Sequence, residues 1–101
     1  LWTFSKLPLH GACRAGLTEV AGRLLEEDGG RVDEGNRWGA TPLFSACQKG
    51  HLEIAQLLVE KGADMDQAAD DGCTPLFMAC QEGHLDIVQL LVKKEGRLIN
   101  V

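Results

Sequence analysis

Two cysteine–histidine pairs carry the residue types that could bind a metal or act as nucleophile and base. Cys47 and His51 are four residues apart, and Cys80 and His84 repeat this spacing. Thiolates and imidazoles are zinc ligands, and positions i and i+4 share one face of a helix. However, a glycine stands directly before each histidine, and glycine commonly ends a helix. A predicted turn therefore splits each pair, which argues against both metal binding and catalysis.

Other patterns associated with catalysis or cofactor binding are weak. Gly29 and Gly30 follow a predicted helix and lack the lysine and serine of a phosphate-binding loop. The neighbouring carboxylates Asp70 and Asp71 lie in a predicted loop, without an apolar pocket that would shift their pKa values. We expect them to be solvated. The sequence thus predicts a protein that is not an enzyme and has no metal or cofactor.

A repeat of 33 residues is the strongest pattern in the chain. TPLFSACQKGHLEIAQLLVEKG, residues 41–62, recurs without a gap as TPLFMACQEGHLDIVQLLVKKE, residues 74–95. A diverged third copy, LPLHGACRAGLTEVAGRLLEEDGG, begins at Leu7, and its one extra residue falls within residues 28–31. Self-similarity at a fixed period of this length indicates a repeat architecture.

Each copy predicts a pair of helices. In the central copy, Thr41 is a suitable cap, and proline is tolerated at the first helical position that follows it. The first predicted helix covers residues 43–49, where apolar residues recur at the spacing of one helical face, and Gly50 ends it. The second covers residues 52–60. The polar segment 63–72 then predicts a loop or hairpin.

One such helix pair has an apolar face that it cannot bury alone, and stacked neighbours bury it for each other. The expected fold is therefore all-α: a solenoid of about three helix-turn-helix units joined by hairpin-like loops. We expect a single domain over residues 1–101, with repeats at about 2–35, 36–68 and 69–101. The last predicted helix, residues 85–93, is as apolar as an internal one, so we expect the chain to be a segment of a longer protein.

Three of the four cysteines, Cys13, Cys47 and Cys80, occupy the same place in each copy. Helices that pack at about 10 Å hold such residues too far apart for a disulfide. We therefore expect small, buried, apolar side chains. Cys73 lies in a predicted loop and has no counterpart. Free thiols throughout suggest an intracellular, cytoplasmic location, with the nucleus also possible.

Composition and charge also restrict the function. The net charge of −5 is spread along the 101 residues and includes no basic stripe, which argues against nucleic acid as the main partner. No apolar run approaches the roughly 18 residues of a membrane span. The N-terminal segment LWTFSKLPLH lacks the pattern of a signal peptide.

The repeated motifs resemble the ankyrin repeat family. The pattern is T-P-L, then A-C, then G-H-x-E/D-I, at a period of 33 residues, and it covers nearly the whole chain. The resemblance implies that His51 and His84 are structural turn residues. The family usually has histidine after T-P-L, but only His10 keeps it. Phenylalanine replaces it in the other two copies, where aromatic packing is the expected substitute.

The first copy departs further, because Gly22 and Arg23 stand where the central copy has Gln56 and Leu57. Glycine costs about 1 kcal/mol in the interior of a helix. We therefore expect a weaker second helix in this copy.

The resemblance implies a module that binds a partner protein or peptide through a concave face of loop tips and inner helices. Trp38, on a predicted loop tip, is either a contact for that partner or packs on the neighbouring loop. Basic residues lie toward the N-terminal side of this face and acidic ones toward the other, so we expect a partner of opposite polarity. Carried over by position, the face comprises Arg14, Ala15, Arg37, Trp38, Ala40, Gln48, Lys49, Asp70, Asp71, Cys73, Gln81 and Glu82.

Two other functions remain open. The chain could be a structural spacer or scaffold that holds flanking domains and has no partner of its own. It could also self-associate weakly through the apolar faces of its end repeats.

Overall fold

Six α-helices account for most of the described chain, which comprises residues 8–27 and 32–95 of a computed structural model. No β-strand is assigned within these two ranges. The all-α fold class is therefore confirmed. The extra residue expected within residues 28–31 lies outside the described residues. The helices are α1 (Pro8–Ala15), α2 (Thr18–Glu27), α3 (Pro42–Lys49), α4 (Leu52–Glu60), α5 (Pro75–Gln81) and α6 (Leu85–Glu95).

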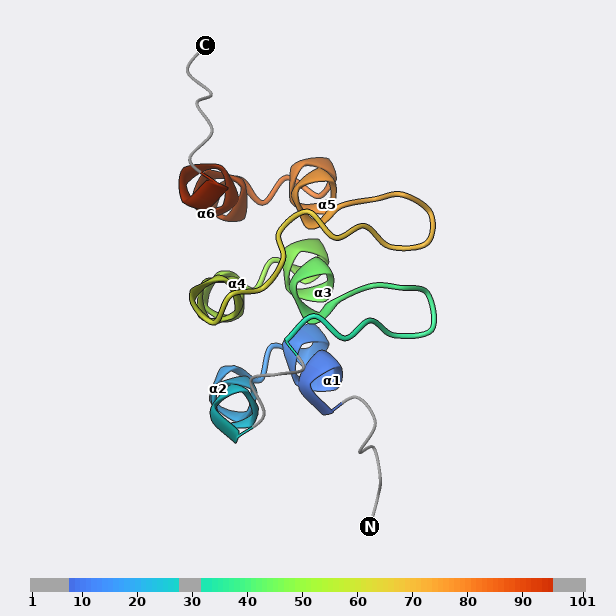
Figure 1. Cartoon of the computed structure of the whole chain (residues 1–101). Helices are drawn as coiled ribbons and strands as arrows, with labels where there is room; N and C mark the ends of the chain where they lie inside the picture. The colour runs from blue at the N-terminus through green and yellow to red at the C-terminus, as the bar shows by residue number, and fades with distance from the viewer. Residues whose placement is uncertain (1–7, 28–31, 96–101) are drawn as a thin grey trace.

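The helices stack in two parallel rows (Figure 1). In the inner row α1 packs against α3 and α3 against α5, and in the outer row α2 packs against α4 and α4 against α6. Each inner helix also packs against the outer helix that follows it in sequence. The loops before α3 and α5 project to the same side of the stack (Figure 1). Repetition of one helix pair thus produces a row of equivalent loops beside a row of equivalent helices.

Capping hydrogen bonds, proline and glycine set the helix boundaries that the sequence predicted. The Thr41 hydroxyl accepts a hydrogen bond of 3.1 Å from the backbone N–H of Phe44, and Thr74 caps α5 through Phe77 in the same way. Proline follows each threonine as the first helical residue. Gly50 ends α3 with a left-handed φ of 81°, a conformation that side chains with a Cβ rarely adopt. The predicted capping and termination of the central copy are therefore confirmed.

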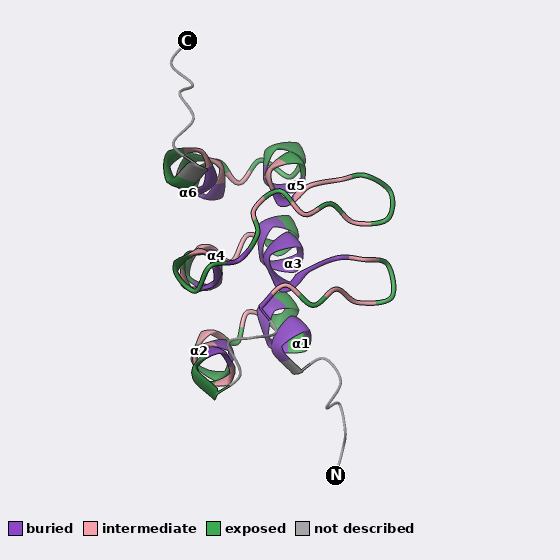
Figure 2. Cartoon of the chain, in the orientation of Figure 1, coloured by how far each residue is buried: buried purple, intermediate pink, exposed green. Residues whose placement is uncertain are grey.

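The core lies between the two rows and continues from one repeat to the next (Figure 2). Most of its members on the inner helices are small, apart from Leu9 and Leu43, and most of those on the outer helices are larger aliphatic residues. The small residues let the helix backbones approach closely, and the aliphatic side chains fill the space between the rows. Its buried members include Ala12, Cys13, Leu25, Leu43, Ala46, Cys47, Ile54, Leu58, Ala79, Ile87 and Leu91.

Equivalent positions are not equally buried at the two ends of the stack. Cys13 and Cys47 are buried as expected, but Cys80 is exposed, so that expectation was wrong for the third copy. Val20, which aligns with the fully buried Ile54, is 47% exposed. Cys47 and Ile54 lie between two neighbouring repeats. In the described part of the chain, Cys80 and Val20 belong to repeats with a neighbour on one side alone (Figure 2).

Gly22 does not interrupt the second helix of the first copy, because α2 runs unbroken from Thr18 to Glu27. A Cβ on Gly22 would lie 3.8 Å from Cδ1 of Leu57 on the neighbouring α4, which is ordinary van der Waals contact. A Cβ would thus fit at this position without a clash, so the approach of α4 does not require glycine here.

Histidine side chains connect successive repeats. Nε2 of His51 donates to the backbone carbonyl of Arg14 at 3.2 Å, and Nε2 of His84 donates to that of Gln48 at 3.2 Å. Both carbonyls belong to the last turn of an inner helix, where they have no partner within the helix. The imidazole also lies over a glycine: a Cβ on Gly50 would be 2.6 Å from Cε1 of His84. The structural role that the resemblance implied for these histidines thus has a physical basis.

This arrangement predicts different costs for two glycine substitutions. Gly83 has a φ of 77° like Gly50, but a Cβ on it would meet no atom of the described residues within 4 Å. Gly83→Ala should therefore lower the free energy of unfolding by about 1–2 kcal/mol, the cost of a left-handed alanine. Gly50→Ala should cost at least about 1 kcal/mol more, because the displaced His84 also loses its hydrogen bond.

Urea denaturation followed by circular dichroism measures both costs. Adding His84→Ala removes the clash, so it should destabilise the Gly50→Ala variant less than it destabilises the unsubstituted chain. Equal costs for the two glycine substitutions would contradict the proposed contact.

Candidate functional site

The two loops that flank the candidate site are closed by equivalent hydrogen bonds. The backbone N–H of Asn36 donates to the carbonyl of Ala40 at 2.9 Å, and that of Ala69 donates to Cys73 at 2.9 Å. The Asn36 side chain additionally accepts from the backbone N–H groups of Trp38 and Ala40. Each loop is therefore a hairpin-like turn, as the sequence predicted, and hydrogen bonds hold its tip.

The first loop is also attached to the second. The backbone N–H of Asp70 donates to the carbonyl of Trp38 at 2.9 Å. The Asp70 side chain lies close to Gly39, where an added Cβ would be 2.5 Å from Oδ1. The two loop tips are therefore joined to each other and form one continuous edge above the inner helices.

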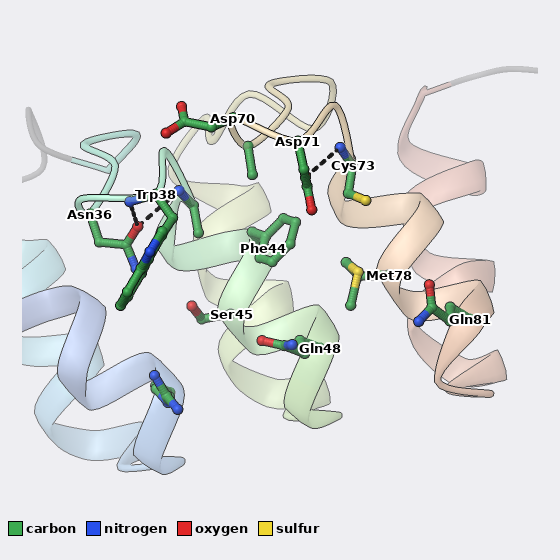
Figure 3. Close-up of a pocket in the computed structure, with 13 residues that line it drawn as sticks. Asn36, Trp38, Phe44, Ser45, Gln48, Asp70, Asp71, Cys73, Met78 and Gln81 are labelled. Atoms are coloured by element: carbon green, nitrogen blue, oxygen red, sulfur yellow. Dashed lines mark hydrogen bonds between the residues drawn. The ribbon is translucent and has the colours of Figure 1, made fainter.

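A groove of about 460 Å³ lies between these loop tips and the inner helices (Figure 3). This volume falls within the range typical of ligand-binding pockets. Figure 3 shows residues from both loops on one side and residues from α3 and α5 on the other. The lining residues are Arg14, Asn36, Trp38, Ala40, Phe44, Ser45, Gln48, Ala69, Asp70, Asp71, Cys73, Met78 and Gln81.

Most residues assigned to the concave face from the sequence do meet at this groove. Those that line it are Arg14, Trp38, Ala40, Gln48, Asp70, Asp71, Cys73 and Gln81. The other four, Ala15, Arg37, Lys49 and Glu82, are exposed and do not line it. Arg37 lies beside the groove, while Lys49 and Glu82 are at the C-terminal ends of their inner helices.

Sequence reasoning missed five lining residues: Asn36, Phe44, Ser45, Ala69 and Met78. One signal was available, because Ser45 and Met78 are equivalent positions that differ between two nearly identical copies. A position that differs between two otherwise nearly identical repeats is a candidate for a surface that contacts a ligand. Asn36 and Ala69 are also equivalent, and each closes a loop hairpin.

Phe44 and Phe77 have different surroundings although both replace the usual histidine. Phe44 is buried in a small cluster with Ala40 and Met78 beneath the groove, which agrees with the expected aromatic packing. Phe77 is 50% exposed, so the expectation was wrong there. The difference follows from position, because α3 has a neighbouring repeat on each side and α5 does not within the described residues.

Trp38 combines a fixed backbone with an accessible ring. Its N–H and carbonyl are both hydrogen-bonded within the loop edge, yet the residue is 60% exposed. The Arg37 guanidinium lies 5.2 Å from the ring centroid, within the range of a cation–π contact. The backbone of Trp38 is therefore bonded to the neighbouring loop, while contact of its exposed side chain with a partner stays a prediction.

Asp71 is one of three charged residues that line the groove, with Arg14 and Asp70. Its Oδ1 accepts a 3.0 Å hydrogen bond from the backbone N–H of Cys73, and this bond holds the pKa of the carboxyl below its usual range. Asp71 is therefore ionised at neutral pH. Desolvation, followed by the neighbouring Asp71, raises the pKa of the Cys73 thiol, so Cys73 is less nucleophilic than an ordinary cysteine.

The cysteines of the core are less reactive still. Burial raises the pKa values of Cys13 and Cys47 to about 12. Residues 8–27 and 32–95 contain no group of three or more histidines, cysteines or acidic residues that could hold a metal ion. None of the helices in these ranges is long and apolar enough to cross a membrane.

A buried histidine lies behind the groove. Nε2 of His10 on α1 is 3.0 Å from Oγ of Ser45, which lines the groove from α3. Burial lowers the pKa of His10, nearby Arg14 acts in the same direction, and a hydrogen bond with the Ala40 backbone opposes them. His10 thus connects α1, α3 and the loop before α3 while it remains neutral.

Comparison with known proteins agrees with this architecture. The family described as "Ankyrin repeats (3 copies)" matches residues 9–101. The chain therefore belongs to the ankyrin repeat family, and the resemblance inferred from its sequence is confirmed. Ankyrin repeats are generally protein-binding modules.

One curated relative is the E3 ubiquitin-protein ligase XBAT33 of Arabidopsis thaliana. It is 46% identical to this chain over 49 residues, which are 48% of this chain but 9% of the relative. The chain thus spans a small part of that protein. The similarity concerns the repeats and gives no reason to infer ligase activity here.

The lowered pKa of His10 predicts a dependence of stability on pH. Below about pH 6.5 the unfolded chain binds a proton at His10 that the folded chain resists. The free energy of unfolding should therefore fall as the pH drops below that value, by at most about 1.4 kcal/mol per pH unit for this one group.

The contribution of His10 can be separated by comparison with His10→Gln, which cannot titrate. The difference in unfolding free energy between the two proteins should shrink between pH 7.5 and pH 5.5. Parallel curves over this range would contradict the assignment.

Proposed function

We propose that this chain binds a partner protein or peptide in the groove between its loop tips and inner helices. The observation that carries the proposal is the exposed Trp38 ring on a backbone held by hydrogen bonds at the edge of a 460 Å³ groove. Tryptophan provides a large contact area and is enriched among residues that dominate binding energy. A fixed position reduces the entropy lost on binding.

The protein acts in this proposal by binding alone, without catalysis or a cofactor. The His10–Ser45 pair at the groove is buried, and we propose no catalytic role for it. The most accessible thiol of the groove, Cys73, has a raised pKa. Four free cysteines support an intracellular, cytoplasmic location for the interaction. Neither nucleic acid nor membrane is proposed as the partner, since the net charge is −5 and no basic stripe is present in the sequence.

Self-association is a second candidate, favoured by exposed apolar residues at the two ends of the stack. Leu85 is 70% exposed, and Leu17, Val20 and Phe77 are about half exposed. Light scattering at increasing concentration distinguishes it, because an association through these residues raises the apparent mass. The spacer function requires neither the groove nor the ends to bind anything.

Replacement of Trp38 by alanine tests the proposed function. The chain is used to capture proteins from a cell lysate, and the affinity of each captured protein is then measured by calorimetry. Trp38→Ala should weaken the specific partner by about tenfold or more, because the buried aromatic contact is lost.

Leu85→Ala is the matched control, since it removes a similarly exposed apolar side chain from the outer row, away from the groove. It should leave the affinity unchanged. Circular dichroism first establishes that both variants fold. If Trp38→Ala weakens binding no more than the control, or if nothing is captured, the groove is not the binding site and the spacer function is favoured.

A further inference from the structure

The half of the groove next to α5 has an apolar floor. Phe44 and Met78 are packed together there with Ala40, in a cluster distinct from the main core between the helix rows. Both also line the groove, so the part of their surface that remains accessible faces the space a ligand would enter. An apolar surface of this kind is suited to the methylene groups of a long side chain.

A carboxylate lies directly above this floor. Figure 3 shows Asp71 extending from its loop into the groove between Phe44 and Cys73, while the Asp70 carboxylate points away. The hydrogen bond from the Cys73 backbone fixes Asp71 through Oδ1. A carboxylate has about four acceptor sites, so Asp71 can accept further hydrogen bonds from a ligand.

The groove supplies no cation of its own at this end. Among the described residues, Arg14 is the one basic residue that lines the groove, and it lies on α1, beyond α3 from α5. Two amides, those of Gln48 and Gln81, border the floor from the inner helices and occupy equivalent positions (Figure 3). Side-chain amides both donate and accept hydrogen bonds, so they can pair with the backbone of an extended chain.

We propose that this half of the groove binds an arginine or lysine side chain from an extended segment of the partner protein. The apolar stem lies on Phe44 and Met78, and the charged head pairs with Asp71. This inference rests on the proposed function and specifies the chemistry of the partner. We call this half the Asp71 subsite; its residues are Phe44, Gln48, Asp71, Cys73, Met78 and Gln81.

Other side chains fit the Asp71 subsite poorly. An acidic side chain would be placed beside an ionised carboxylate, and like charges repel. A purely apolar side chain would cover the floor but would also remove water from Asp71 without replacing its hydrogen bonds, which is costly. A long cationic side chain can cover the apolar floor with its stem and pair with the carboxylate through its charged head. Arginine can in addition form two parallel hydrogen bonds with the carboxylate.

The test uses a random-peptide library displayed on phage, with the complete chain as the immobilised target. Peptides that bind the chain but not its Trp38→Ala variant are taken as groove ligands. We expect them to share an arginine or lysine with an apolar neighbour. Synthetic versions are then titrated by fluorescence anisotropy against the chain and two variants.

Asp71→Asn removes the charge but keeps an oxygen that can accept from Cys73, so the loop should be retained. It should weaken the selected peptides by about tenfold, since a close charge pair is lost. Glu53→Gln is the matched control, because it removes one exposed carboxylate from α4, outside the groove. It should change the affinity by less than about twofold, as expected for a distant charge at physiological salt.

A double-mutant cycle identifies the pair directly. Replacement of the basic peptide residue by its neutral analogue, citrulline for arginine, should weaken binding to the chain about tenfold. The same replacement should have little further effect on Asp71→Asn. Additive effects of the two changes would overturn the pairing.

The remaining outcomes separate this inference from the proposed function. Groove ligands that lack a basic residue, or that bind Asp71→Asn unchanged, overturn the inference and leave the groove as a binding site. A failure to select any peptide that depends on Trp38 overturns both.

Discussion

The structure depends on one constraint: a single helix pair cannot bury its apolar face and must share it with a neighbour. Burial of this face supplies most of the favourable free energy of folding. The outer helices provide the bulk of the shared core, through Ile54, Leu58, Ile87 and Leu91. The inner helices approach closely through alanine and cysteine. Loss of contact between two repeats therefore removes core from both of them.

Polar contacts then fix how the stacked repeats are aligned. A histidine at the turn of one repeat donates to the last-turn carbonyl of the preceding inner helix, above a left-handed glycine. Apolar packing is not directional, whereas these hydrogen bonds have one geometry. His10 adds a buried polar contact between α1 and Ser45 on α3. The buried His10 is neutral. Protonation of its imidazole would therefore disturb this contact and the alignment of the repeats.

The groove follows from the same alignment. Stacking in register brings the loop tips into one edge, joined by the hydrogen bond from Asp70 to Trp38. The inner helices present equivalent side chains below this edge at a constant spacing. Positions that support the stack are nearly identical between the two regular copies, and Ser45 and Met78 differ where the groove is lined. The two regular copies thus share their helix scaffold, while one pair of equivalent groove positions on these helices differs between them.

The sequence by itself determined the helices, their caps, the loops between them and the order in which they stack. These features depend on local chemistry, such as the Thr41 cap, or on the repeat period of the sequence. The resemblance to the ankyrin family, carried over by position, also placed eight of the groove's thirteen lining residues on one face. The tertiary structure alone decided how deeply each equivalent residue is buried. Cys80 and Phe77 match Cys47 and Phe44 in their repeats but are exposed, since burial depends on neighbours from other repeats and not on the residue's own helix.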